Sequence, residues 1–250
     1  MADIERVKYE KQPLVEVIYQ LRYPTILSIS ASDPVQFQDA IKRDYPFYRK
    51  IVQEKEVVVN DVKRSVIKET NHEFISVNKA VKVNLTSSFI AISTLSYDQW
   101  ENFRELSKLV RNTFEQIYQP TFYTRVGLRY KDVIDRTKFG LQDKGWIDLI
   151  KPNVLGIINE TNQFSLKQWS VNSEFTFPGS DVATKQMLHL ATKVGDSLPV
   201  MVFDCDYFKM GNIPINEVSA LSDQLHDRSS SFLRSSITEE LHLAMIPQAL

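Results

Sequence analysis

One order of sequence patterns occurs twice along the chain, and it constrains the fold more than any other feature. Residues 13–23, PLVEVIYQLRY, alternate between two sets of side chains, one of them strongly apolar, which predicts a strand with one buried face. The last three residues, Leu21-Arg22-Tyr23, recur 107 residues later as Leu128-Arg129-Tyr130, within a second strand-like segment at 121–134. A match of three residues is weak alone, so the order of the surrounding elements decides whether a unit is repeated.

A short helix and a meander of strands follow the first strand. Asp33 and Pro34 supply the start of the helix, and Tyr45 with Pro46 stops it. Between residues 48 and 95, short polar breaks separate runs rich in β-branched residues, which predict antiparallel strands. These runs are IVQEKEVVV, RSVIKE, HEFISVN, AVKVNLT and SFIAISTLS.

The clearest amphipathic helix closes the first half. It is predicted to run to about Tyr118 and to end before Pro120. Its apolar residues recur at spacings of three and four, which is the periodicity of one helix face. They are Trp100, Phe103, Leu106, Val110, Phe114 and Ile117.

The second half repeats this order with small shifts. After the strand at 121–134 we predict a short helix at 144–150, and the apolar positions between 218 and 233 predict a long closing helix. Ser236 and Glu239 have the spacing of a capping box, which predicts a break and a second short helix to about Met245. The strands expected in between are Leu155–Ile158, Gln163–Trp169, Val171–Phe177, Gln186–Ala191 and Pro199–Tyr207.

We therefore predict an α+β fold made by tandem duplication of a β-α-β(meander)-α unit. The first copy spans residues 1–120 and the second spans residues 121–250, and the two together form one compact domain. Joining their sheets would give a largely antiparallel sheet with two long helices packed on one face. The opposite, curved face is then the natural place for a ligand or a partner.

Composition excludes several classes of protein. The 250 residues are 43% hydrophobic with a net charge of -1, which excludes a disordered chain and a molecule held on nucleic acid or a membrane by its overall charge. The single Cys205 excludes an intramolecular disulfide framework, and the four histidines lack the spacing of metal ligands. No apolar run is long enough for a signal peptide or a membrane span. We expect no metal, no cofactor, no membrane association and a cytoplasmic location.

The second strand contains candidate residues for nucleic-acid binding. Alternation places Tyr123, Arg125 and Arg129 on one face, and aromatic and basic side chains together can bind a single strand of nucleic acid. The alternative is a partly solvated strand whose arginines extend toward water.

A second pair of candidates follows from the repeat itself. Arg22 and Arg129 occupy equivalent places in the two copies, so they would clamp an acidic ligand or the carboxylates of a partner. The alternative is that each arginine pairs internally with a carboxylate such as Glu16 or Asp132. With the tyrosines that follow the arginines, the candidate binding residues are Arg22, Tyr23, Tyr123, Arg125, Arg129 and Tyr130.

Other reactive side chains have simpler interpretations. Cys205 lies between Asp204 and Asp206, whose charges raise the pKa of a thiol, so we expect a packed strand cysteine rather than a nucleophile. The two aspartates are expected to be solvated on the outer face, although they could act as paired acids or bind a hard cation. His226 is expected to lie at the surface or interface side of the closing helix.

Several motifs resemble one known family. They include a PL-x-E-V start, Tyr45-Pro46, a Y-x-x-W-x-x-F helix opening at Tyr97, a GLRY strand at Gly127, and an H-x(5)-F pattern from His226 to Phe232. Together they resemble a sporadically distributed bacterial protein family of about 250 residues whose function is unknown, over nearly the whole chain. That family usually has Asn where this chain has Asp132, which puts the role of this position in doubt. The resemblance implies a bacterial cytoplasmic protein, and its patchy distribution favours phage-defence or mobile-element conflict systems.

The sequence leaves three hypotheses on function. It lacks GxGxxG, GxxxxGK[ST], GxSxG and HExxH motifs, although dispersed catalytic residues would leave no such trace. The leading hypothesis is a non-catalytic recognition protein, acting as sensor, adaptor or inhibitor, whose partner is another protein, such as a co-encoded one. The alternatives are a nucleic-acid-binding protein that uses the curved sheet face and a regulator that binds a small ligand. Each is compatible with a homo-oligomer.

Overall fold

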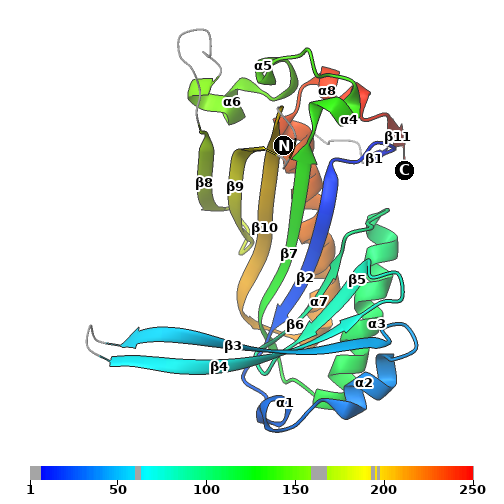
Figure 1. The fold of residues 1–250 in the computed structure, drawn as a ribbon, viewed down its shortest axis with the longest axis vertical. Coiled ribbons are helices and arrows are strands. Elements are labelled where there is room, and N and C mark those ends of the chain that lie inside the picture. Colours follow the sequence, from blue (N-terminus) through cyan, green and yellow to red (C-terminus); the bar gives the residue numbers. More distant parts are fainter. Residues whose placement is uncertain (1–6, 60–62, 159–167, 193–194, 196–197, 250) are drawn as a thin grey trace. The chain divides into compact units, whose positions relative to one another are not determined.

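The computed structural model describes residues 7–59, 63–158, 168–192, 195 and 198–249. It has a mixed α/β fold with a large antiparallel sheet (Figure 1). The strands are β1 (Val7–Tyr9), β2 (Leu14–Arg22), β3 (Phe47–Val59), β4 (Lys63–Ile75), β5 (Val81–Leu85), β6 (Phe89–Thr94), β7 (Tyr123–Ile134), β8 (Ser170–Thr176), β9 (Ala183–Thr192), β10 (Pro199–Ile213) and β11 (Pro247–Ala249). The helices are α1 (Leu27–Ala31), α2 (Val35–Ile41), α3 (Trp100–Tyr118), α4 (Arg136–Phe139), α5 (Trp146–Leu149), α6 (Pro152–Leu155), α7 (Val218–Ser236) and α8 (Glu239–Ala244), with a 3₁₀ turn, η2 (Ile215–Glu217).

Nine of the described strands are hydrogen-bonded in the order β3-β4-β5-β6-β2-β7-β10-β9-β8. The short strands β1 and β11 form a separate antiparallel pair, with Tyr9 opposite Pro247. The chain divides into two compact units, and neither is a contiguous half of the sequence. Unit 1 contains residues 1–16, 128–208 and 223–250, whereas unit 2 contains residues 17–127 and 209–222.

Unit 2 consists of antiparallel strands with α2 and α3 packed against one face. The ring of Tyr23 stacks on Phe114 of α3 with their centroids 4.7 Å apart, and the ring of Phe37 in α2 meets Phe74 of β4. Side chains alternate along a strand, so the residues next to these aromatics point to the opposite face. That face carries a row of largely polar residues, as the register below shows.

The β3–β4 hairpin extends beyond the rest of the sheet in unit 2. The two strands pair along all 13 residues of each, whereas β5 pairs with β4 at His72–Ile75. The remainder is therefore a two-stranded ribbon, visible as the long projecting arm in Figure 1. A two-stranded ribbon is only marginally stable in water when nothing covers it.

The larger sheet of unit 1 contains β8, β9, most of β10 and the second part of β7, with α7 packed against its inner face. Phe203 of β10 contacts Phe232 of α7, and the hydroxyl of Tyr130 is 2.7 Å from Nδ1 of His226. The β1–β11 pair belongs to this unit, and there the hydroxyl of Tyr9 is 2.8 Å from Nδ1 of His242. Leu225 and Leu241 are fully buried in the same core.

Most of the expected elements are present. The helix predicted to end near Tyr118 is α3, and the strands expected at 171–177, 186–191 and 199–207 are β8, β9 and β10. The expected run RSVIKE and the first four residues of HEFISVN are one continuous strand, β4, which ends at Ile75. The expected strand at 163–169 lies largely outside the described residues.

Two local predictions were wrong. Residues 155–158, expected as a strand, are the end of α6 and a 3₁₀ turn, because Pro152 starts a helical turn at its first position. The cap of α8 is Thr238, which accepts a hydrogen bond from the amide of Leu241, whereas Ser236 still lies within α7. Within the described ranges, no helix has both the length and the apolar character needed to cross a bilayer.

Candidate functional site

A row of residues, all polar except one alanine, crosses the face of unit 2 that lies opposite α2 and α3. The register places one residue of each strand beside the next, from β3 through β4, β5 and β6 to β2. The row is Arg49, Glu73, Asn84, Ala91 and Gln20. We call this row, together with Asn71, Lys82, Arg22 and Arg125 beside it, the polar row.

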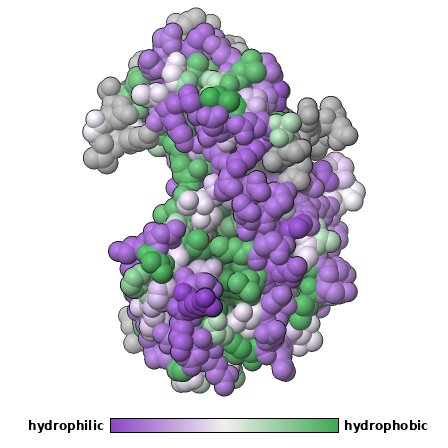
Figure 2. All heavy atoms as spheres, turned by 90° about the vertical axis from the view of Figure 1, so that its right-hand side faces the viewer, coloured by the Kyte–Doolittle hydropathy of each residue, from purple (hydrophilic) through white to green (hydrophobic). Residues whose placement is uncertain are grey.

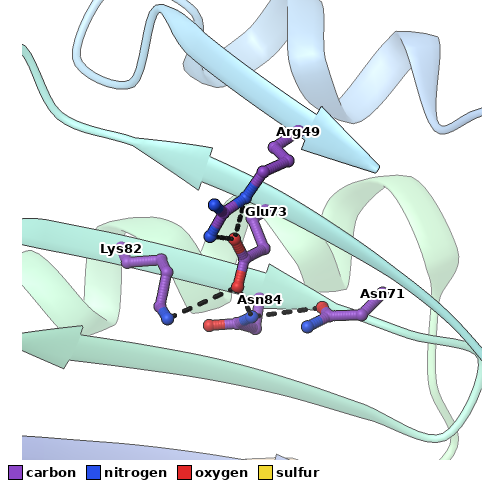
Figure 3. Close-up of polar contacts among 5 residues, drawn as sticks. All are labelled: Arg49, Asn71, Glu73, Lys82 and Asn84. Carbon is purple, nitrogen blue, oxygen red and sulfur yellow. Dashed lines mark hydrogen bonds and ion pairs between the residues drawn. The ribbon is translucent and has the colours of Figure 1, made fainter. Parts of the chain in front are cut away.

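Glu73 is the centre of one end of the polar row (Figure 3). Its carboxylate accepts hydrogen bonds from Arg49, whose Nε is 2.8 Å away, and from Nδ2 of Asn84 at 3.1 Å. Nζ of Lys82 lies 3.4 Å from the same carboxylate, and Asn84 also donates to Oδ1 of Asn71. Burial of Glu73 opposes its ionisation, but the bonds from Arg49 and Asn84 and the charge of Lys82 outweigh burial, so its pKa lies below the usual value.

Two arginines meet at the other end of the polar row. The side-chain oxygen of Gln20 accepts a hydrogen bond from Nε of Arg22 at 3.1 Å and one from Nη1 of Arg125 at 3.2 Å. Gln20 is neutral, so it bonds both guanidinium groups without cancelling either charge. Within the described residues no carboxylate pairs with Arg22, which is exposed.

Gly127 is what allows Arg125 to reach Gln20. A Cβ atom at position 127 would stand 2.1 Å from Nη1 of Arg125, so the guanidinium occupies the space that a side chain would fill. Arg125 itself is buried. The polar row thus ends in one buried and one exposed cation, both directed at the same amide oxygen.

The predicted tyrosines have structural roles. Tyr23 is buried and donates to the carbonyl oxygen of Thr86, and Tyr123 is buried and donates to Glu115 of α3 at 2.8 Å. Tyr123 therefore lies on the helix side, and the prediction that it shares a face with Arg125 was wrong. Tyr130 is buried against His226. None of the three presents a ring to solvent for stacking on bases.

Arg129 belongs to unit 1. Its Nε and Nη2 atoms each lie 2.5 Å from an oxygen of Asp204, a bidentate ion pair. The internal pairing that we weighed for this arginine is present, but its partner is Asp204 rather than Glu16 or Asp132. The expectation of a solvated Asp204 was also wrong, because Arg129 makes burial of this carboxylate possible.

Two further side chains can be compared with their expected roles. Burial, and after it the carboxyl groups of Asp132 and Asp204, raises the pKa of the Cys205 thiol far above its ordinary value, as expected for a packed cysteine. His226 is buried rather than exposed, because the hydroxyl of Tyr130 provides the hydrogen-bond partner that a buried imidazole needs. Within the described residues, no group of three or more His, Cys, Asp or Glu side chains could bind a metal ion.

Sequence reasoning missed Glu73, Arg49 and Asn84. Alternation within HEFISVN places Glu73 opposite the apolar Phe74, which marks it as a residue of the outer face. Its neighbours could not be named, because they depend on the register of three strands.

The molecular surface is mixed, with apolar residues gathered in patches between hydrophilic ones on the face in Figure 2. Comparison of the chain with protein-family models, curated proteins and solved structures finds no match.

Proposed function

We propose that this chain is a non-catalytic recognition protein that binds an acidic surface of another protein through the polar row of unit 2. The observation that carries the proposal is Arg22, an exposed cation on the face opposite α3 whose Nε donates to the neutral side-chain oxygen of Gln20. A carboxylate from a partner would supply the counter-charge that Gln20 lacks.

The other end of the polar row supports the same partner chemistry. Arg49 and Lys82 share the single carboxylate of Glu73, so this cluster also has one more positive charge than negative. Hydrogen bonds from Arg49 and Asn84 to the carboxylate of Glu73 hold Arg49 and Glu73 in place before a partner arrives, which lowers the entropy lost on binding. A preorganised, moderately cationic surface favours an acidic protein patch.

The proposal of a protein without catalysis rests on the chemistry of the site. The polar row contains no Ser, Thr or Cys that could act as a nucleophile, and its one carboxylate is held ionised by cations rather than prepared to exchange a proton. Cys205, the single thiol of the sequence, is buried and protonated.

We propose further that the protein acts in the cytoplasm of a bacterium, as a sensor, adaptor or inhibitor in a phage-defence or mobile-element conflict system.

The proposal includes an origin of the chain by duplication. In the strand order β6 neighbours β2 and β10 neighbours β7, and a 19-residue helix follows each of β6 and β10. The first strands of the two proposed copies, β2 and β7, also contain the repeated Leu-Arg-Tyr. This correspondence supports a duplicated unit whose two long helices cover one face of a shared sheet.

Matched charge reversals test the proposed function. Arg22→Glu and Lys82→Glu reverse charges in the polar row, whereas Lys108→Glu makes the same change on an exposed residue of α3. A protein partner recovered with the wild-type chain should bind the purified Arg22→Glu and Lys82→Glu variants at least ten-fold more weakly, and the Lys108→Glu variant with unchanged affinity. An equal loss of affinity in all three variants, or no loss of affinity in the first two, would contradict the proposal.

Salt and nuclease treatment distinguish the nucleic-acid alternative from the proposed protein partner. Binding through phosphates weakens steeply and linearly in the logarithm of salt concentration, and nuclease destroys the bound species. If the molecule that no longer binds the Arg22→Glu variant is nucleic acid, then the proposal of a protein partner is wrong and the nucleic-acid alternative replaces it.

A further inference from the structure

Strand β3 forms one edge of the nine-stranded sheet, and within the described residues no strand pairs with its outer side. It is 13 residues long, whereas β8, at the other edge, has 7 residues. Proteins usually protect a long edge with Pro, a β-bulge or a covering segment, because its unpaired amides and carbonyls attract a further strand. Residues 47–59 contain neither Pro nor Gly, and their register with β4 is continuous, without a bulge.

The hydrogen-bond ladder shows which backbone groups of β3 point outward. The amide of Ser76 donates to the carbonyl oxygen of Val81 in the register that pairs β4 with β5. Successive residues of a strand direct these groups to alternate sides, so even-numbered residues of β4 face β5 and odd-numbered ones face β3. Odd-numbered residues of β3 lie opposite odd-numbered residues of β4. The even-numbered residues of β3, from 48 to 58, therefore direct their amides and carbonyls outward.

Three apolar side chains are exposed at the start of the same strand. Phe47 is 48% exposed, Tyr48 is 38% exposed and Val52 is 54% exposed. The edge of β3 thus combines unpaired backbone groups with apolar surface, which is typical of a strand that pairs with another chain.

We propose that β3 pairs antiparallel with β3 of a second copy of this chain, about a twofold axis at Gln53. Gln53 is the middle residue of β3, so an axis there pairs all 13 residues of both strands. A twofold interface uses the same strand in both copies and closes on itself, so the product is a dimer rather than a fibre.

The order of charges along β3 favours this register. With the axis at Gln53, Lys50 of each copy lies opposite Glu56 of the other, and no like charges lie directly opposite each other. The same register sets Phe47 of each copy opposite Val59 of the other. Nζ of Lys50 lies 2.6 Å from a carboxylate oxygen of Asp33 in the single chain, and its three N–H donors can serve both carboxylates.

The neighbouring registers place like charges together. An axis at Val52 would set Arg49 of each copy opposite Lys55 of the other, which repeats the repulsion twice. An axis at Glu54 would set this residue opposite its own copy. The charges therefore select the register in which the two strands also overlap along their whole length.

Sedimentation velocity on the full chain tests for the dimer. One strand from each copy is a smaller interface than the about 20–30 residues per side of a standard stable complex, so we expect a reversible dimer with a dissociation constant of about micromolar order. Monomer should give way to dimer as the protein concentration rises through that range. A chain that stays monomeric up to about 1 mM would overturn the proposal.

Val52→Pro tests the pairing of the two backbones. Residue 52 directs its amide outward, so Pro at this position removes no hydrogen bond of the β3–β4 ladder and is tolerated on an edge strand. The variant should keep the far-UV circular dichroism of the wild type and should be monomeric where the wild type is a dimer. A dimer of unchanged strength in this variant would show that β3 is not the interface.

Reversed charges test the register and do not depend on the proline variant. Glu56→Lys sets lysines opposite each other, and Lys50→Glu sets glutamates opposite each other, so each variant alone should dimerise about ten-fold more weakly or worse. A mixture of the two variants should form a heterodimer of near wild-type strength, because each lysine then faces a glutamate. Glu105→Lys, on the exposed side of α3, is the control and should dimerise as the wild type does. A mixture that dimerises no better than the separate variants would overturn the register.

The dimer goes beyond the proposed function of the polar row. Arg22→Glu and Lys82→Glu should leave dimerisation unchanged, because these residues lie on β2 and β5 rather than on the edge strand. A monomeric wild-type chain whose protein partner is lost on Val52→Pro substitution would show that the edge accepts a strand of another protein, and the second copy would be wrong.

Discussion

The guanidinium of Arg125 lies over Gly127, two residues further along the same strand, in the space where any other residue would have its Cβ atom. This relationship joins the backbone of β7 to the polar row, because Arg125 reaches Gln20 from that position.

Gly127→Ala should displace Arg125 from Gln20 and destabilise the fold by about 1 kcal/mol, because the clash falls on the mobile end of a side chain. Urea denaturation measures the loss. In a double-mutant cycle, Arg125→Ala should remove most of the penalty, since no guanidinium then opposes the methyl group. Additive effects of the two substitutions would contradict the contact.

Glu73→Gln should destabilise the chain by about 1–3 kcal/mol at pH 7, because Arg49 and Lys82 lose their shared counter-charge. The pKa of Glu73 is lowered in the folded state, so the stability it contributes is present above the unfolded-state pKa of about 4.3 and is lost as pH falls through the folded value. The gap in unfolding free energy between wild type and variant should therefore shrink in acid. A gap that stays constant down to pH 2.5 would show that ionisation of Glu73 is not the cause.

Asp132 should have the opposite pH dependence. Burial raises its pKa to about 7, so between about pH 4 and pH 7 the folded state holds a proton that the unfolded state has released. Stability from this group is complete below pH 4 and declines as pH rises, by at most about 1.4 kcal/mol per pH unit. Unfolding free energies of wild type and Asp132→Asn across this range should diverge with rising pH, with the variant more stable at pH 7. Parallel curves would refute a raised pKa.

Ile246 has a backbone φ of 57°, a left-handed conformation that a β-branched side chain adopts only under strain. It follows α8 and precedes Pro247, where the chain turns into β11. Ile246→Gly should relieve the strain and raise stability by up to about 1 kcal/mol, and Ile246→Asn should give a smaller gain. Thermal unfolding compares the variants, with Leu243→Gly, an exposed position within α8, as a destabilising control.

The periodicity of neighbouring residues predicted the individual helices and strands, because these elements are formed by residues close together in the sequence. The apolar spacing of three and four identified α3, and alternation identified β7 and β10, because both periodicities are properties of neighbouring residues. The run at 155–158 was ambiguous for the same reason, since a short apolar stretch fits a strand or a helical turn. Pro152 decided it in favour of the turn.

The candidate site depended on longer-range relationships. Asp204 was expected in solvent because the sequence shows its neighbours in the chain but not Arg129, which lies 75 residues earlier. The burial of His226 likewise requires Tyr130 from another strand. Glu73 was overlooked because the cations that surround it come from β3 and β5, whose register no local pattern specifies.

The path of the chain between the two units has a practical consequence. The sequence passes from one unit to the other after residues 16, 127, 208 and 222, within β2, β7, β10 and α7. No single truncation can therefore yield either unit as a continuous fragment. Isolating unit 2 would require a redesigned gene that splices residues 209–222 onto 17–127 through an artificial loop.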